Sequence, residues 1–268
     1  MKIKKTRIRM GKISIKATLK SAFVLYQKNF KSLSAFSLLY ALFMMCSALS
    51  TFFFGKSVGS PLMLGLAALL MIAMYVLLLV VVPKAMLGIQ IHIAGIIRGE
   101  KPGVRDSFTK TKGRVAWLIS NMMMLVLILV IPLLAVIYLF NALKSPLSFL
   151  VTIPLSLLFL SVIYMLVPMI ALEDSSGFKI KASFRLIKGN HVRVIALVFL
   201  TATVFTLPSS VLPQTVFKGH PLATLIVAAV TSLLLVITFA FAEVVRGVLY
   251  HQLSAQNALP EEPSEPPA

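Results

Sequence analysis

The sequence predicts an all-α protein, an integral membrane bundle of six transmembrane helices with amphipathic helices on its cytoplasmic face. Three observations predict this class. The 268 residues are 59% hydrophobic, with a mean hydropathy of +0.96, whereas soluble domains are ~45–50% apolar. Six apolar stretches are each about 20 residues or longer, which is enough to cross a bilayer. Basic residues gather in alternate connections between these stretches, and this asymmetry orients membrane proteins.

The six expected spans are residues 33–54, 62–82, 115–140, 148–172, 194–217 and 222–245. With a cytoplasmic N-terminus, 23 of the 26 Lys and Arg residues lie inside, and only Lys56, Lys144 and Lys218 lie outside. All eight acidic residues also lie inside, so the Lys and Arg count rather than the net charge sets the orientation. Both termini are therefore expected in the cytoplasm. The net charge of +18 is expected to face anionic lipid headgroups, and the sequence has no nucleic-acid-binding motif.

The segment before the first span has the pattern of an amphipathic helix. On a helical wheel, apolar side chains gather within one third of the circle: Ile15, Leu19, Ala22, Phe23, Tyr26, Phe30 and Leu33. Lysines occupy the opposite third: Lys16, Lys20, Lys28 and Lys31. This pattern is typical of a helix that lies in the headgroup region of a membrane. The alternative is a cytoplasmic helix that packs on the protein's own inner loops.

The second apolar stretch is longer than a bilayer requires. The chain stays mostly apolar from Leu62 to Ile97, and as one helix this stretch would be ~54 Å long, against a hydrocarbon core of ~30 Å. We expect a kink at Pro83, with the remainder along or below the inner interface. The inner loops at 98–114 and 173–193 are each long enough for one helix. The outer turns at 55–60, 141–146 and 218–221 leave no room for an extracellular domain.

Three inner segments share a short pattern that predicts a threefold repeat. A basic residue lies three positions before Phe23, Phe108 and Phe184, and a lysine follows each of them four or five positions later. The second spans of the first two units also share a Val-Pro pair, at 82–83 and 167–168. The predicted unit is a basic interfacial helix followed by a helical hairpin, over approximately residues 15–98, 99–173 and 174–255. One membrane domain, 1–255, would then precede a Pro- and Glu-rich disordered cytoplasmic tail at 256–268.

The basic and aromatic side chains of these inner segments are the residues we expect to contact lipid or a partner. They are Lys16, Lys20, Phe23, Lys28, Lys31, Phe108, Lys112, Phe184, Arg185 and Lys188.

Ionisable groups inside a membrane are the default functional residues, and the central parts of the expected spans contain none. Glu243 and Arg246 come closest, at the inner end of the last span, where a spacing of three allows pairing on one helix face. We interpret them as a structural interface pair rather than a proton or ion site. Hydroxyls near Pro208 and Pro213 on the fifth span are interpreted as partners of freed backbone carbonyls, with a cavity-lining role as the alternative.

No catalytic, cofactor-binding or metal-binding residues are expected. The sequence has no nucleophile elbow, P-loop or dinucleotide-binding fingerprint, and its four histidines are scattered without metal-ligand spacing. Glu173 and Asp174 could hold one ion, although a helix-end or turn role is the preferred interpretation. The single cysteine, Cys46, lies within the first span, so an internal disulfide framework is excluded.

The loop after the fourth expected span is the most distinctive stretch. It reads Val-Pro-Met-Ile-Ala-Leu-Glu-Asp from Val167 and Lys-Ala-Ser-Phe-Arg-Leu-Ile-Lys-Gly-Asn from Lys181. Together with Arg98-Gly99-Glu100 and Leu249-Tyr250, it resembles the membrane domain attached to some bacterial glycerophosphoryl diester phosphodiesterases. The resemblance covers nearly the whole chain and implies a bacterial inner (plasma) membrane location. In the two-domain enzymes hydrolysis belongs to a separate soluble barrel, so the resemblance implies no phosphodiesterase activity here.

The sequence thus favours a multi-pass membrane protein without catalytic activity of its own, in a lipid-associated, accessory or scaffolding role. Its expected partners are anionic headgroups at the cytoplasmic face, and a protein partner or a second copy of the chain. Ala228 and Ser232 form a small-residue pair that suits helix–helix contact. The alternative function is a transporter or translocator of small molecules or lipids that uses the broken fifth span. A lipid-acting enzyme ranks last.

Overall fold

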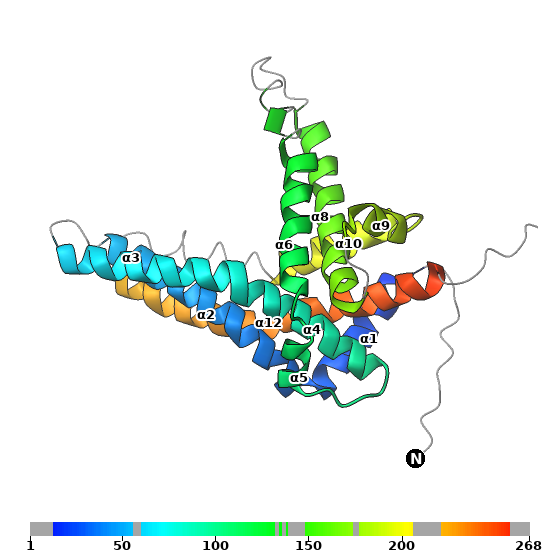
Figure 1. The fold of residues 1–268 in the computed structure, drawn as a ribbon, viewed down its shortest axis with the longest axis horizontal. Helices are drawn as coiled ribbons and strands as arrows, with labels where there is room; N and C mark the ends of the chain where they lie inside the picture. The colour runs from blue at the N-terminus through cyan, green and yellow to red at the C-terminus, as the bar shows by residue number, and fades with distance from the viewer. Residues whose placement is uncertain are drawn as a thin grey trace, which may run out of the picture.

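The computed structural model describes residues 13–55, 60–131, 134, 135, 138, 148–173, 177–205 and 221–257. Every regular element within these residues is helical, as the sequence predicts, and Figure 1 shows the path of the chain. The elements are α1 (Ile15–Lys28), α2 (Phe30–Gly55), α3 (Pro61–Val76), the π-helix η1 (Leu77–Val81), α4 (Val82–Ile97), α5 (Val104–Thr109), α6 (Arg114–Leu125), the π-helix η2 (Val126–Val130), α8 (Ser148–Leu172), α9 (Ile180–Leu186), α10 (His191–Phe205) and α12 (Pro221–Asn257).

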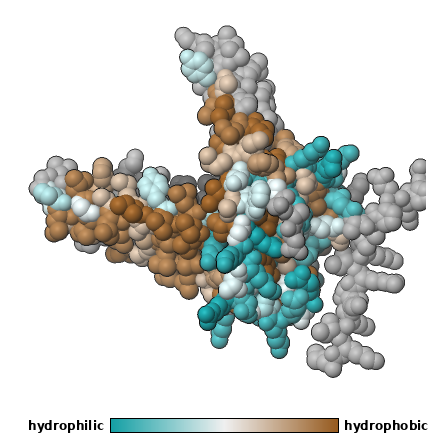
Figure 2. Space-filling model, in the orientation of Figure 1, coloured by the Kyte–Doolittle hydropathy of each residue, from teal (hydrophilic) through white to brown (hydrophobic). Residues whose placement is uncertain are grey.

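The helices form two arms that diverge from a common base (Figure 1). α2, α3 and the first half of α12 lie side by side in one arm, and α6 and α8 make up the other. The base contains α1, α4, α5 and the second half of α12. Figure 2 shows hydrophobic residues over the arms and hydrophilic residues gathered over the base. Such extended apolar surface is what contact with lipid requires.

Three of the described helices are long and apolar enough to cross a membrane, and they indicate a membrane protein: Phe30–Phe54, Pro61–Ile97 and Ala229–Asn257. They overlap the first, second and sixth expected spans, and the second and the sixth continue past the expected ends at 82 and 245. Shorter apolar helices at Arg114–Ile128, Ser156–Leu172 and His191–Thr201 overlap the other three. Six complete crossings stay a prediction, because the third, fourth and fifth expected spans each extend beyond these shorter helices.

The helix that begins at Pro61 departs from α-helical geometry just before the proline where we expected a kink. In η1 the N–H of Val82 bonds to the carbonyl oxygen of Leu77, five residues back. A proline ring has no N–H and clashes with the carbonyl four residues earlier, so a wider π turn before Pro83 relieves the clash. η2 has the same form, and the next proline in the sequence, Pro132, again follows two residues after its end.

The core of the protein lies where α4, α8 and α12 contact one another. Ile93 of α4, Met165 of α8 and Val244 of α12 belong to one cluster of fully buried side chains. The remaining long helices pack around this centre. α2 contacts α12, α3 and α4; α6 contacts α4 and α8; and α10 contacts α8 and α12. α1, α5 and α9 come just before α2, α6 and α10 in the chain. Each packs chiefly on one central helix: α1 on α12, α5 on α4 and α9 on α8.

Both expected inner-loop helices are present, as α5 and α9. One small residue lies at the contact of each short inner helix with the central helix beneath it. Ala22 on α1, Ser107 on α5 and Ser183 on α9 are all at most 1% exposed, and each immediately precedes the phenylalanine of the predicted repeat. A small side chain lets two helix backbones approach closely.

Several sequence predictions fall on residues outside the described part of the chain. They include Lys56, Lys144 and Lys218, the Pro208–Pro213 break and Asp174. α12 continues to Asn257, two residues into the segment expected to be a tail. The rest of that segment is also outside the described residues.

Candidate functional site

The candidate site begins with α1, which carries the predicted basic face. Its first turn is capped by Ser14, whose hydroxyl oxygen accepts a hydrogen bond from the N–H of Ala17 at 3.4 Å. Asn29 ends it, because its side chain donates to the Leu25 carbonyl oxygen at 2.9 Å. α2 starts at the next residue. The helix therefore leads directly into the first apolar helix.

α1 is a docked helix. Its Thr18 hydroxyl donates to Oε1 of Gln252 at 2.7 Å, and its Tyr26 hydroxyl donates to the Ile237 carbonyl oxygen at 3.1 Å. The ring of Tyr26 also meets that of Phe241 edge to face, with centroids 5.6 Å apart. Docking was the alternative we gave for this segment, although the surface beneath it is α12 rather than the inner loops.

Docking buries only part of the predicted apolar face. Ala22 and Tyr26 are buried, whereas Phe23 is 51% exposed and Phe30 41% exposed. The four lysines are exposed. They are Lys16, Lys20 and Lys28 on α1 and Lys31 in the first turn of α2, and we call the four together the α1 basic face. Among the residues described, none of these four lysines forms an ion pair with an acidic side chain. Docking on α12 thus leaves both the four lysines and the rings of Phe23 and Phe30 exposed.

The other predicted contact residues divide into two groups. Lys112, Arg185 and Lys188 are exposed. Phe108 and Phe184 are partly buried against the core, and the Phe108 ring stacks on Phe36 with centroids 4.8 Å apart. These two aromatic rings pack inward and hold α5 and α9 on the core, whereas the Phe23 ring is half exposed.

The Glu243–Arg246 pair predicted from spacing is present and lies in the core. Glu243 is 1% exposed, and its Oε1 lies 2.9 Å from an Arg246 guanidinium nitrogen. Nε2 of Gln90 on α4 donates to the other carboxylate oxygen at 2.6 Å. The Arg246 guanidinium lies over the Tyr164 ring of α8, 4.5 Å from its centroid. A buried charge is stable only when such partners surround it, and these join α4, α8 and α12.

Sequence reasoning missed Gln90 and Tyr164. A glutamine in a long apolar helix is a signal that could have identified the first, because a buried amide needs a hydrogen-bonding partner. Tyr164 is the only tyrosine among the aromatic residues of α8, and its hydroxyl, which donates to the Ala242 carbonyl oxygen at 3.2 Å, is the signal that could have identified the second.

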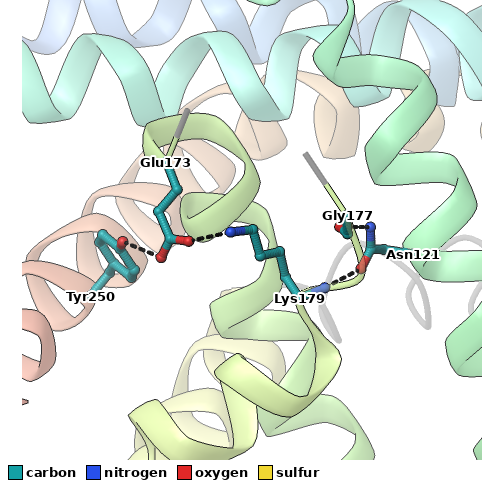
Figure 3. Close-up of polar contacts among 5 residues, drawn as sticks. All are labelled: Asn121, Glu173, Gly177, Lys179 and Tyr250. Carbon is teal, nitrogen blue, oxygen red and sulfur yellow. Dashed lines mark hydrogen bonds and ion pairs between the residues drawn. The ribbon is translucent and has the colours of Figure 1, made fainter. Parts of the chain in front are cut away.

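A second polar cluster fixes the loop after α8 (Figure 3). Glu173 accepts hydrogen bonds from Nζ of Lys179 at 2.7 Å and from the Tyr250 hydroxyl at 3.3 Å. Asn121 on α6 accepts from the backbone N–H of Lys179 at 2.7 Å and donates to the Gly177 carbonyl oxygen at 3.2 Å. Glu173 therefore has the helix-end role that we preferred for it.

The described part of the fifth expected span shows how its hydroxyls are used. The Thr201 hydroxyl donates to carbonyl oxygens of its own helix, those of Leu197 at 2.8 Å and Val198 at 3.0 Å. No proline frees these two carbonyls, so the expected pairing of hydroxyls with freed carbonyls stays a prediction. The residues around Pro208 and Pro213 lie outside the described part.

Comparisons with known protein families, curated protein sequences and solved structures found no match to this chain.

Proposed function

We propose that this chain is a six-span protein of the bacterial plasma membrane, without catalytic activity of its own, whose α1 basic face binds anionic lipid at the cytoplasmic surface. The observation that carries the proposal is that four lysines and the rings of Phe23 and Phe30 all stay exposed when α1 docks on α12. α12 fixes this surface, and the first apolar helix starts immediately after it. A lipid-associated accessory or scaffolding role follows.

Electrostatics and burial favour lipid as the ligand. Each Lys near an anionic membrane surface contributes about 1 kcal/mol of attraction. Aromatic rings beside such cations add apolar contact at the depth of the headgroups. The acidic residues Glu173 and Glu243, in contrast, are already paired within the protein.

The three-unit architecture belongs to this proposal, and the packing supports it. In the predicted units, each interfacial helix and each first span contacts the last helix of the preceding unit: α5 and α6 contact α4, and α9 and α10 contact α8. α1 and α2 contact α12, so the order closes on itself. Phe23 and Phe108 are 85 residues apart, as are Pro83 and Pro168, which agrees with one repeated unit.

The lipid part is tested on the full-length protein in a mild detergent, with binding of phosphatidylglycerol measured by native mass spectrometry. Replacement of all four lysines of the α1 basic face with Gln should weaken binding at least tenfold, because two engaged lysines already contribute about 2 kcal/mol. Replacement with Arg keeps the charge and should keep the affinity. Unchanged binding in the Gln variant would refute lipid recognition by α1.

The orientation is tested separately, with reporter tags inserted at Ser57 and Ser145. We expect both tags on the outer side of the membrane. If a tag reported from the cytoplasm, α1 would not lie at the cytoplasmic surface, and the proposal would be refuted.

A transporter is the second candidate, and one observation favours it. Oε1 of Gln90 and Nε of Arg246 are buried in the core without a hydrogen-bonding partner within the described structure. A polar substrate or water path through the centre would use such atoms. Cysteines placed at Thr201, Thr206 and Ser209 in a Cys46→Ala background should then react with water-soluble thiol reagents, and no reaction would exclude an aqueous path along the fifth span.

Membership of the phosphodiesterase membrane-domain family stays a hypothesis that rests on the motifs from Val167 to Asn190. It carries no hydrolytic activity to this chain. Unaltered membrane lipid composition on deletion and on overexpression would agree with a role other than lipid chemistry.

A further inference from the structure

A groove of about 450 Å³ lies between α1 and the end of α4. It is lined by Lys20, Ser21, Val24, Leu25, Lys28, Asn29 and Ile96. Two basic residues and two polar residues thus surround three aliphatic ones. No acidic side chain lines the groove among the residues that the structure describes.

The two lysines follow one line along the helix. Lys20, Val24 and Lys28 are spaced by four residues, so their side chains lie on the same face, and the Cα atoms of the two lysines are ~12 Å apart. Each ammonium group ends a flexible four-carbon stem, and both can reach a group placed above Val24. The two cations therefore flank an apolar floor, and the Ser21 hydroxyl is available there as a further donor.

The groove lies at the edge of the expected membrane region. It ends at Asn29, whose carbonyl oxygen accepts the hydrogen bond from the N–H of Leu33 that opens α2. α2 is the first helix long enough to cross the membrane. The positive end of its helix dipole adds to the charge of Lys28. A ligand in the groove would thus have an anionic part between the two ammonium groups and an apolar part on Val24, Leu25 and Ile96.

We infer that this groove binds one molecule of an anionic glycerophospholipid, with its phosphate between Lys20 and Lys28 and an acyl chain along the aliphatic floor. The inference rests on the proposed lipid-binding function and names the part of α1 that performs it. Charge complementarity selects the phosphate, and the apolar floor selects a lipid over a soluble anion. Lys16 and Lys31 belong to the same basic face but do not line the groove.

The test compares two double variants of the full-length protein that change the net charge equally. Lys20→Gln/Lys28→Gln alters the groove, and Lys16→Gln/Lys31→Gln alters the same face outside it. Binding of phosphatidylglycerol is measured by native mass spectrometry. We expect the groove variant to bind at least tenfold more weakly and the control variant to lose less than threefold.

The outcomes separate this inference from the proposed function. Equal losses in both variants would overturn the groove and leave lipid binding by the whole basic face in place. No loss in either variant would overturn both proposals.

A second variant, Val24→Trp, fills the groove without a change in charge, and Val24 is already 42% exposed, so the fold should tolerate it. It should reduce binding as much as the groove variant, and full affinity in Val24→Trp would overturn the inference. Glycerol 3-phosphate serves as a soluble competitor. Displacement of the lipid by equimolar glycerol 3-phosphate would identify the occupant as a soluble phosphate and overturn the assignment to a lipid.

Discussion

Gln90 on α4 donates its side-chain Nε2 to a carboxylate oxygen of Glu243 on α12 at 2.6 Å, and to the backbone carbonyl oxygen of the same residue at 3.1 Å. The two residues are 153 positions apart in the sequence. Their contact ties the end of the predicted first unit to the last helix of the chain. It also shares the buried negative charge between an amide and the Arg246 guanidinium, which a single ion pair would not achieve.

Replacement of Gln90 by Leu should destabilise the protein by about 1–3 kcal/mol, because it removes a hydrogen bond from a buried carboxylate. Thermal unfolding in detergent measures the loss. Gln27→Leu is the matched control, since Gln27 is exposed on α1 and such substitutions change stability by at most ~0.5 kcal/mol. If the Gln90→Leu protein unfolded at the same temperature as the wild type, the Gln90 contact would contribute no measurable stability.

Gly247 should not accept even one methyl group. A Cβ there would lie 2.7 Å from Cγ2 of Ile93 and 3.0 Å from Oε1 of Gln90, so Gly247→Ala should cost about 1–3 kcal/mol through overpacking of α4 on α12. Gly65→Ala is the opposite case, because nothing lies within 4 Å of the new Cβ on α3. Alanine at that helical position should stabilise by ~0.5–1 kcal/mol.

The two glycine variants are compared by thermal unfolding in the same detergent. Ile93 is fully buried, so Ile93→Ala destabilises by itself, but the double variant Gly247→Ala/Ile93→Ala should lose less stability than the sum of the two single variants. An unfolding temperature for Gly247→Ala equal to or above that of Gly65→Ala would contradict close packing of α4 on α12.

Leucine at each of the three buried small positions should loosen the short helix that carries it. Ala22→Leu, Ser107→Leu and Ser183→Leu overfill the contacts of α1, α5 and α9 with the central helices, at about 1–3 kcal/mol each. Ser183→Leu also removes the hydroxyl that donates to the Val162 carbonyl oxygen at 2.9 Å. Hydrogen exchange of each short helix measures the effect as faster exchange.

Leucine at exposed positions on the same helices supplies the matched controls. These are Ala17→Leu on α1, Arg105→Leu on α5 and Lys181→Leu on α9. Their exchange should match that of the wild type. If the buried and exposed substitutions had equal effects, these three contacts would not hold the short helices.

Glu173→Gln should weaken the polar contacts of Glu173 drawn in Figure 3. The amide oxygen still accepts from Tyr250, but the ion pair with Lys179, in which the two side chains are 35% and 12% exposed, is lost. We expect a cost of about 1–2 kcal/mol and a non-additive double variant with Lys179→Met. Glu100→Gln is the control, because its partner Arg98 and Glu100 itself are more than half exposed and such pairs contribute ~0–1 kcal/mol. Equal unfolding temperatures for Glu173→Gln and Glu100→Gln would refute this role.

Local patterns made several parts of the structure predictable. The helical class, the helices α5 and α9 in the inner loops, and the pairing of Glu243 with Arg246 all depend on hydropathy or spacing within one segment. The departure from α-helical geometry lies just before Pro83, since a proline acts on the turn that precedes it, and the kink expected there stays a prediction. The six spans and the repeat stay predictions.

The sequence could not show which faces of its amphipathic helices meet the rest of the protein. Phe23, Phe108 and Phe184 occupy equivalent places in the repeated pattern, yet Phe23 is half exposed and the other two pack against the core. Burial depends on the helix that lies opposite, and that helix is distant in the chain. The groove beside α1 has the same origin, because Ile96 of α4 forms one of its walls.

The sequence by itself determined that this chain is helical and rich in membrane-compatible segments, and it placed the lysines of α1 on one face, because composition and helical period act over a few turns. Only the tertiary structure decided that α1 docks on α12, that Gln90 meets Glu243, and that Lys20 and Lys28 flank a groove. These contacts join segments that only the packing of α4, α8 and α12 brings together.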